Sequence, residues 1–217
     1  MSAATETPET RRTLEEWDDH AGRWVLYRNE AAHTEDCQRF PYDAVPSTIF
    51  LDTSVVNLLV KFSGTIFEHE PIPTNIPQER AFDIEALMHL MRIGARANWI
   101  VTTSPRALQE LANTRDAGLR ELLVSYGREF LFTHNEGYGH STDLGRKSID
   151  APFLSKLPDA ADRELIGNAV GLGCEVFCTA DRTTIIRFRE ALIGVPIRIM
   201  TPIEWWRQFK PWAGLLL

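Results

Sequence analysis

The amino-acid sequence contains no apolar run near the roughly 18 residues that a membrane-spanning helix requires. Its N-terminal segment has no apolar core of the kind found in secretory signal peptides. Only three cysteines are present, and no two of them form a Cys-x-x-Cys pair. We interpret Cys37, Cys174 and Cys178 as structural thiols in a reducing compartment. We therefore expect a cytoplasmic protein that does not associate with a membrane.

Several familiar catalytic patterns are also missing. The six histidines show neither His-x-x-x-His nor His-Glu-x-x-His spacing, which argues against a zinc hydrolase. No Gly-x-Gly-x-x-Gly follows the first expected strand, which argues against a dinucleotide-binding fold. An aspartyl-phosphate phosphatase would carry a second aspartate two residues after its nucleophile, whereas Asp52 is followed by Thr53 and Ser54.

Positive charge is in deficit, with 23 Lys and Arg against 30 Asp and Glu and a net charge of −7. This balance argues against a protein that coats nucleic acid through charge alone. It leaves room for an enzyme that meets a phosphate backbone through a bound metal ion. The length of 217 residues suits one well-buried domain with additions.

What the sequence does contain is an alternation of short apolar runs and helical patterns. We expect strands at 48–51, 99–102, 129–132, 175–179 and 197–200. We expect helices at 54–62, 81–95, from 105, and at 116–126, 160–170, 183–192 and 203–209, with a loop at 63–79. This alternation predicts an α/β fold, a three-layer α/β/α sandwich around a central parallel sheet.

Two segments stand apart from this pattern. Residues 1–46 are expected to be an N-terminal extension, disordered at first and then helical from Thr13, before a main domain at 47–217. The helix prediction rests on a Thr13/Glu16 capping box and on one apolar face that includes Trp17 and Trp24. That face packs on the same chain or, alternatively, docks a partner. Residues 134–157 are polar and contain glycine, which predicts a long functional loop.

Acidic residues fall where a parallel α/β sheet places its ligands, beyond the carboxyl ends of the strands. Asp52 and Asp181 each follow an expected strand. Asp162 lies within the apolar arc of its helix, whereas Glu164 points away from it, and Glu110 flanks the apolar face of another helix. Each acid alone also has an ordinary explanation as a turn residue, a helix cap or a solvated side chain.

Taken in order, these acids resemble the four acidic positions of the PIN-domain family of nucleases, with the toxin-type ribonucleases as the nearest relatives. The resemblance covers about residues 48–203 and rests on four segments: Ile49-Phe50-Leu51-Asp52-Thr53-Ser54, Ser104-Pro105-Arg106-Ala107-Leu108-Gln109-Glu110-Leu111, Asp162-Arg163-Glu164-Leu165-Ile166-Gly167-Asn168-Ala169 and Val176-Phe177-Cys178-Thr179-Ala180-Asp181. The N-terminal extension and the long segment 134–157 depart from a minimal toxin-type domain.

The resemblance implies that Asp52, Glu110, Asp162 and Asp181 hold one or two Mg²⁺ or Mn²⁺ ions. It further implies that Thr179, with Thr53 or Ser54, supports them through hydrogen bonds. Two carboxylates about 4 Å apart repel by roughly 4 kcal/mol at an effective dielectric near 20, so four would not converge without a cation. Hard oxygen ligands select Mg²⁺ or Mn²⁺, and a metal-bound water can attack phosphorus.

The sequence therefore predicts a metal-dependent endoribonuclease. A DNA-acting or structure-specific nuclease of the same fold, and a non-catalytic PIN-like scaffold that binds RNA or a protein, are the alternatives. Arg146, Lys147 and Arg182 are candidates for contacts with substrate phosphates. An antitoxin-like protein partner and a homo-oligomer remain open, as does a toxin, defence or RNA-processing role.

Overall fold

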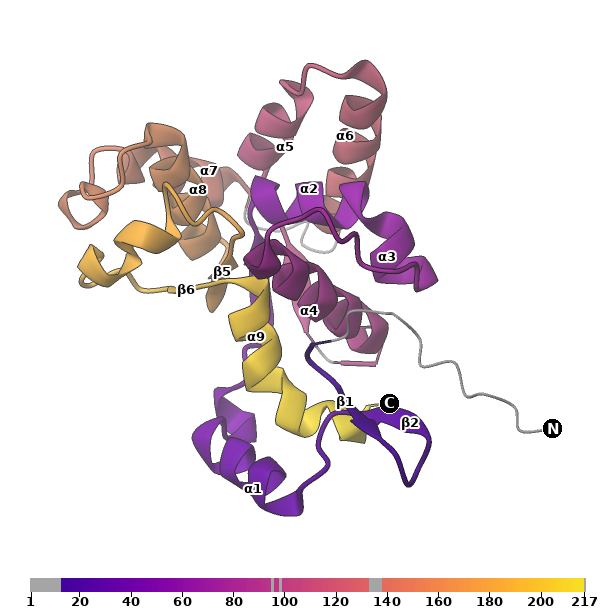
Figure 1. Ribbon diagram of the computed structural model, residues 1–217. Coiled ribbons are helices and arrows are strands. Elements are labelled where there is room, and N and C mark those ends of the chain that lie inside the picture. Colours follow the sequence, from indigo (N-terminus) through magenta and orange to yellow (C-terminus); the bar gives the residue numbers. More distant parts are fainter. Residues whose placement is uncertain (1–12, 95, 98, 133–137, 217) are drawn as a thin grey trace.

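The computed structural model describes residues 13–216 except 95, 98 and 133–137, and it is a mixed α/β structure (Figure 1). Four strands form a parallel sheet in the order β4-β3-β5-β6: β3 (Thr48–Leu51), β4 (Ile100–Thr102), β5 (Val176–Cys178) and β6 (Arg198–Met200). Each of these strands was expected, and each agrees with its expected range to within one residue at either end.

The helices expected in the main domain are largely present. In chain order the α-helices are α1 (Glu30–Arg39), α2 (Thr53–Lys61), α3 (Ser63–Glu68), α4 (Gln78–Gly94), α5 (Pro105–Ala112), α6 (Ala117–Phe132), α7 (Tyr138–Ser148), α8 (Ala160–Gly171) and α9 (Pro202–Phe209). Several begin at the side chains that the sequence indicates. Ser104 accepts from the Ala107 amide ahead of α5, and Thr201 forms a capping box with Glu204 at α9.

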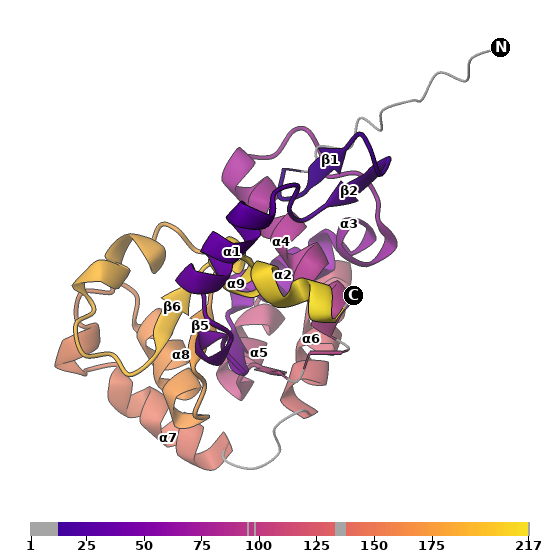
Figure 2. The same ribbon diagram turned by 90° about the horizontal axis from the view of Figure 1, so that it is seen from below.

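Alternate residues along the sheet face two separate cores. Ile49 and Leu51 of β3 join one core with α2, α4 and α9, whereas Phe50 joins the other with α8. Phe50 stacks on Phe177 of β5, its neighbour in the parallel register, with ring centroids 5.3 Å apart. Figures 1 and 2 show α3 and α4 on one side of the strands and α7 and α8 on the other. This arrangement of a parallel sheet between helices is compatible with a three-layer α/β/α fold.

The strand expected at 129–132 is wrong, because α6 continues through this segment to Phe132. The apolar run at its end suggested a strand. The wider spacing is helical, since Leu119, Leu123, Tyr126 and Phe130 recur every three or four residues and all pack against the same core. The sequence-based prediction gave weight to the short apolar run at 129–132 and overlooked the helical spacing that begins at Leu119.

The long loop expected at 134–157 is also wrong over its described part. Residues 138–148 form α7, and Pro152–Leu154 form a short 3₁₀ helix, η2, while residues 134–137 lie outside the described residues. Small residues let α7 lie directly on α8: a Cβ at Gly171 would come within 2.6 Å of the Ser141 Cα. The helix was missed because glycine and serine, rather than large apolar residues, make its contact face.

The N-terminal helix expected from Thr13 is wrong. The segment forms an antiparallel hairpin, β1 (Glu16–Asp18) and β2 (Arg23–Val25), in which Trp17 and Trp24 are cross-strand partners with ring centroids 5.6 Å apart. Thr13 does not cap a helix. Its amide and hydroxyl donate hydrogen bonds to the buried Glu85 of α4 at 2.9 and 2.6 Å. The two tryptophans therefore fit a strand pair, where residues opposite each other pack as closely as helical neighbours do.

Smaller differences concern two connections. Part of the expected loop 63–79 is helical as α3, and the expected helix at 183–192 is a shorter 3₁₀ segment, η3 (Ile186–Ala191). A short 3₁₀ helix, η1 (Tyr42–Ala44), precedes β3, and another, η4 (Lys210–Leu215), follows α9. Within the described residues, no helix is long and apolar enough to cross a membrane.

Candidate acidic site

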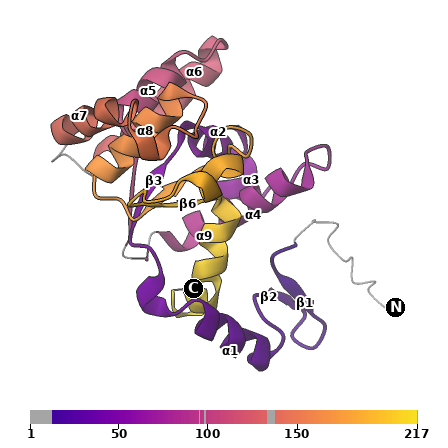
Figure 3. The same ribbon diagram turned by 90° about the vertical axis from the view of Figure 1, so that its left-hand side faces the viewer.

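The parallel strands end at a common edge, and the candidate site lies there. Figure 3 shows α2, α5 and α8 gathered beyond this edge, whereas α1 lies toward the opposite end of the sheet. The backbone continues the ladder past the strands, since the Asp52 amide donates to the Cys178 carbonyl at 3.0 Å and the Thr179 amide to the Met200 carbonyl at 2.9 Å. The first residues after β3 and β5 are thereby fixed to the ends of the neighbouring strands β5 and β6.

Asp52 is the most deeply placed acid of the site, with 2% of its surface exposed. It caps α2 by accepting from the Thr53 amide at 2.7 Å. Its Oδ2 accepts from the hydroxyls of Ser54 at 2.5 Å and Thr179 at 2.7 Å. Burial raises the pKa of Asp52, and these hydrogen bonds oppose the rise. Among the described residues, no lysine, arginine or histidine forms an ion pair with it.

Glu110 lies beside Asp52 on α5. The Thr53 hydroxyl is 3.4 Å from Asp52 Oδ1 and 3.3 Å from Glu110 Oε2, so it lies between the two carboxylates. Burial raises the pKa of Glu110, the Arg106 guanidinium lowers it, and the Asp52 charge raises it further. Arg106 is 3.1 Å from Glu110 and 2.8 Å from Glu164, so this guanidinium connects α5 with α8 beside the site.

Asp181 follows β5 and is held by the next turn of the chain. Its Oδ1 accepts from the amides of Thr183 and Thr184, each at 2.8 Å, and its Oδ2 accepts from the Thr184 hydroxyl at 2.7 Å. Burial acts to raise the pKa of Asp181, but these hydrogen bonds hold it below the ordinary value. The carboxylate is therefore ionised and oriented, as in an Asx-type turn.

Asp162, in the first turn of α8, is less well satisfied. Burial raises its pKa to about 7, a hydrogen bond from the Thr184 side chain opposes that rise, and the charges of Asp52, Asp159 and Asp181 add to it. Its Oδ2 is buried and has no hydrogen-bond partner among the described residues. Asp159 occupies the cap by accepting from the Ala161 amide at 2.9 Å, so capping does not explain Asp162.

Threonine hydroxyls lie among the four acids: the Thr53 hydroxyl lies between Asp52 and Glu110, and the Thr184 hydroxyl donates to Asp181 while its side chain also lowers the pKa of Asp162. The charge of Asp52 also acts on Asp162. Nevertheless, within the part of the chain that the structure describes, no group of three or more His, Cys, Asp or Glu side chains is arranged to hold a metal ion. Neighbouring hydroxyls and amides hold most of these carboxylate oxygens instead.

Two features of the donor set nevertheless fit a divalent cation. Asp52 is a buried carboxylate without a basic partner among the described residues, and Asp162 Oδ2 is a buried oxygen without a hydrogen-bond donor. All the candidate ligands are carboxylate oxygens, which Mg²⁺ and Mn²⁺ favour. The residues present therefore fit a divalent cation in donor type and in burial, although their side chains are not arranged around a cation position.

The basic residues predicted to contact substrate lie in different settings. Arg182 faces α4, where it pairs with the buried Asp83 at 2.5 Å and with Glu79 at 3.2 Å. Its charge is balanced by these two carboxylates within the chain, and its contact with a substrate phosphate stays a prediction. Arg146 and Lys147 are exposed near the end of α7, and Arg146 lies 3.8 Å from Asp143.

Sequence analysis missed several residues that shape the site. Thr183 and Thr184 hold Asp181, and the Thr184 side chain also lowers the pKa of Asp162. The pattern Asp-x-Thr-Thr directly after a buried strand could have indicated such a turn. The Arg106–Glu110 spacing of four residues on one helix could have indicated an ion pair, whereas the contact of Arg106 with Glu164 had no local signal.

Comparison of the chain with protein-family models, curated protein sequences and solved structures finds no significant match.

Proposed function

We propose that the chain is a metal-dependent nuclease with a PIN-like arrangement, an endoribonuclease that uses Mg²⁺ or Mn²⁺. The observation that carries this proposal is Asp162. Its Oδ2 is buried and has no hydrogen-bond partner in the described part of the chain, and the charges of Asp52 and Asp181 act on the same carboxylate. A purely structural role would leave this oxygen at a cost of about 1–3 kcal/mol, whereas a cation would satisfy it.

In this proposal Asp52, Glu110, Asp162 and Asp181 hold the ion. When bound, the ion would supply a water of lowered pKa and would neutralise charge on the phosphate under attack. Thr179 and Ser54 orient Asp52, and Thr184 orients both Asp162 and Asp181. Arg106 holds Glu110 from the outer side. Because the Arg106 guanidinium pairs with Glu110 and not with Asp52 or Asp162, the more buried carboxylates of Asp52 and Asp162 are available to the metal ion.

The preference for RNA over DNA rests on the family resemblance alone, so a DNA-acting nuclease is the second candidate with the same site. One observation favours a third candidate, a PIN-like scaffold without catalysis. Hydroxyls and amides already satisfy both oxygens of Asp181, and Asp52 Oδ2 accepts from two hydroxyls. These carboxylates are therefore already hydrogen-bonded without a metal ion, as expected for a scaffold that binds none.

Calorimetric titration of the metal-free protein with Mn²⁺ separates the enzyme from the scaffold. The proposal predicts saturable binding by the parent protein and by Asp143→Asn, a control for loss of an exposed carboxylate. Asp162→Asn should bind Mn²⁺ at least about tenfold more weakly. Absence of binding in the parent, or equal binding by Asp162→Asn, would favour the scaffold and overturn the proposed function.

A further inference from the structure

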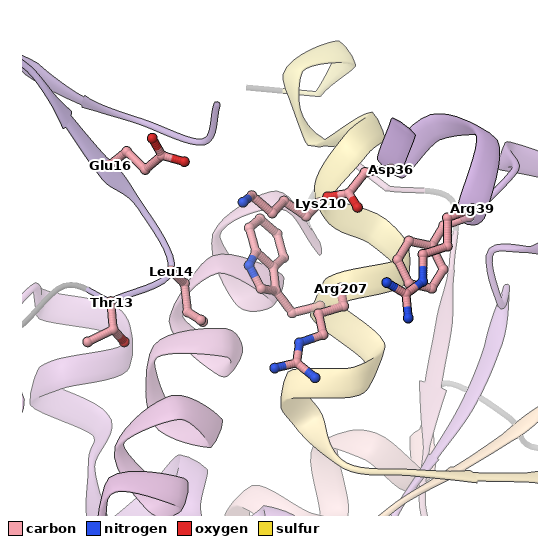
Figure 4. A pocket seen from close by; sticks show the side chains of 9 residues that line it. Thr13, Leu14, Glu16, Asp36, Arg39, Arg207 and Lys210 are labelled. Atoms are coloured by element: carbon pink, nitrogen blue, oxygen red, sulfur yellow. The ribbon is translucent and has the colours of Figure 1, made fainter. Parts of the chain in front are cut away.

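A second polar cavity lies away from the acids, between the N-terminal segment, α1 and α9 (Figure 4). Its volume is about 320 Å³. Arg39 reaches it from α1, while Arg207 and Lys210 reach it from the end of α9 and the start of η4. The cavity belongs to the amino-terminal side of the sheet, because α1 leads into β3 and the Arg198 side chain, at the start of β6, bonds the Ala44 carbonyl.

Three cations and two carboxylates line this cavity, and the carboxylates have other partners. Asp36 accepts from the Tyr27 hydroxyl at 2.7 Å, and Glu16 lies 3.6 Å from the Arg28 guanidinium. Neither of these two acids forms an ion pair with Arg39 or Arg207. Across the described residues, these two arginines have no acidic partner, which leaves both guanidinium groups able to bind an anion at the cavity.

The remaining wall of the cavity is partly aromatic. Trp206 lines the cavity, is 2% exposed, and its Nε1 has no hydrogen-bond partner among the described residues. This nitrogen is itself buried, so the indole is a rigid wall of the cavity beside the two guanidinium groups and is not a donor that an anion in the cavity can reach. The His89 ring stacks on Trp206 with centroids 4.6 Å apart, which holds the indole in place.

We propose that this cavity binds a phosphate group, with the exposed guanidinium groups of Arg39 and Arg207 as its donors. Guanidinium groups match phosphate oxygens with two parallel hydrogen bonds, and two guanidiniums at one cavity repel each other until an anion lies between them. Lys210 adds charge from the rim, where its Nζ lies 4.2 Å from the centre of the Tyr27 ring. The site is separate from the acidic site and does not depend on the proposed nuclease activity.

The phosphate has two possible sources, a small free anion or the backbone of a nucleic acid. Both are tested by calorimetry on the full chain in EDTA, where metal-dependent cleavage is excluded. Inorganic pyrophosphate represents the free anion, and a single-stranded RNA oligomer represents the backbone. The parent protein should bind at least one of these probes, and binding should weaken as salt concentration rises.

The decisive variant is Arg39→Gln combined with Arg207→Gln, with Arg115→Gln as the control for loss of an exposed arginine elsewhere. The double variant should bind the probe at least about tenfold more weakly, while Arg115→Gln stays within about twofold. Loss of pyrophosphate binding identifies a free-anion site, and loss restricted to the oligomer identifies a backbone site. No binding of either probe by the parent, or equal weakening in Arg115→Gln, would overturn the proposal.

A second measurement requires no change of charge. In a ¹⁵N–¹H spectrum the Trp206 indole signal, assigned by its disappearance in Trp206→Phe, should shift on addition of the bound probe. The other indole signals should move less. A Trp206 signal that stays fixed while the probe binds would place the phosphate elsewhere and would also overturn the proposal.

Discussion

The hydroxyl of Thr179, at the end of β5, donates a hydrogen bond of 2.7 Å to Oδ2 of Asp52, at the end of β3. The same oxygen of Thr179 accepts from the Asp181 amide at 3.0 Å. One fully buried side chain therefore connects two of the predicted acids and fixes the distance between their strands. The hydroxyl at position 179 therefore orients Asp52, a role that an apolar side chain of the same size could not fill.

Replacement of Thr179 by valine tests this role. Valine keeps the shape but leaves Asp52 with one donor fewer, which should lower the free energy of unfolding by about 1–3 kcal/mol. Urea unfolding measures the change. Thr74→Val, at an exposed position, should stay within about 0.5 kcal/mol of the parent. Equal stability of the Thr179 and Thr74 variants would show that the hydroxyl does not hold the carboxylate.

Asp162 predicts a pH dependence of stability in the absence of metal. Its pKa is about 7 in the folded protein against an ordinary value of 3.8, so the folded state binds the proton more tightly than the unfolded chain. The contribution of Asp162 to the free energy of unfolding should therefore be greatest below pH 4 and should be lost as the pH rises through about 7. Asp162→Asn removes this penalty and should be more stable than the parent at pH 8 in EDTA, by about 1–3 kcal/mol.

Thermal unfolding between pH 4 and pH 8 measures the effect, with Asp143→Asn as the control. The parent and the control should lose stability over this range relative to Asp162→Asn. If the difference between Asp162→Asn and the parent does not grow with pH, the Asp162 carboxylate is not held in a destabilised, charged form.

The pair of Arg182 and Asp83 predicts a large structural effect. Asp83 is completely buried, and Arg182 is its ion-pair partner at 2.5 Å. Arg182→Met should cost about 3–5 kcal/mol, since it leaves a buried carboxylate unpaired. Arg182→Met combined with Asp83→Asn should recover part of that loss. Urea unfolding of both variants and of Arg80→Met, an exposed neighbour, measures this, and equal losses in Arg182→Met and Arg80→Met would contradict it.

The parts of the fold and of the acidic site that could be predicted are those indicated by residues close together in the sequence. Asp52 and Asp181 were placed at one edge because each follows a short apolar strand, and parallel strands end together. The pairing of Thr13 with Glu85, and of Arg182 with Asp83, joins residues far apart in the sequence, so no local pattern indicates it. The strand expected at 129–132 failed because its apolar run was read without the helical period that begins near Leu119.

Packing between α7 and α8 gives a prediction with a control in the same helix pair. A Cβ at Gly171 would meet the Ser141 backbone at 2.6 Å, whereas a Cβ at Gly139 meets nothing within 4 Å. Gly171→Ala should therefore destabilise the protein by about 1–3 kcal/mol. Gly139→Ala should stabilise it by about 0.5–1 kcal/mol through helix propensity. Thermal unfolding of both variants measures the two signs, and a stabilised Gly171→Ala protein would mean that α7 does not lie this close to α8.

The central claim is that these carboxylates support metal-dependent cleavage of RNA, and its most direct test is a cleavage assay. Labelled single-stranded RNA and DNA oligomers are incubated with the parent, Asp162→Asn and Asp143→Asn in Mn²⁺ and in EDTA. The account predicts that the parent and Asp143→Asn cut RNA in Mn²⁺ alone, and that Asp162→Asn cuts it about 100-fold more slowly. Cleavage of DNA alone would select the DNA-acting alternative. Equal cleavage by Asp162→Asn, or cleavage that persists in EDTA, would contradict the account.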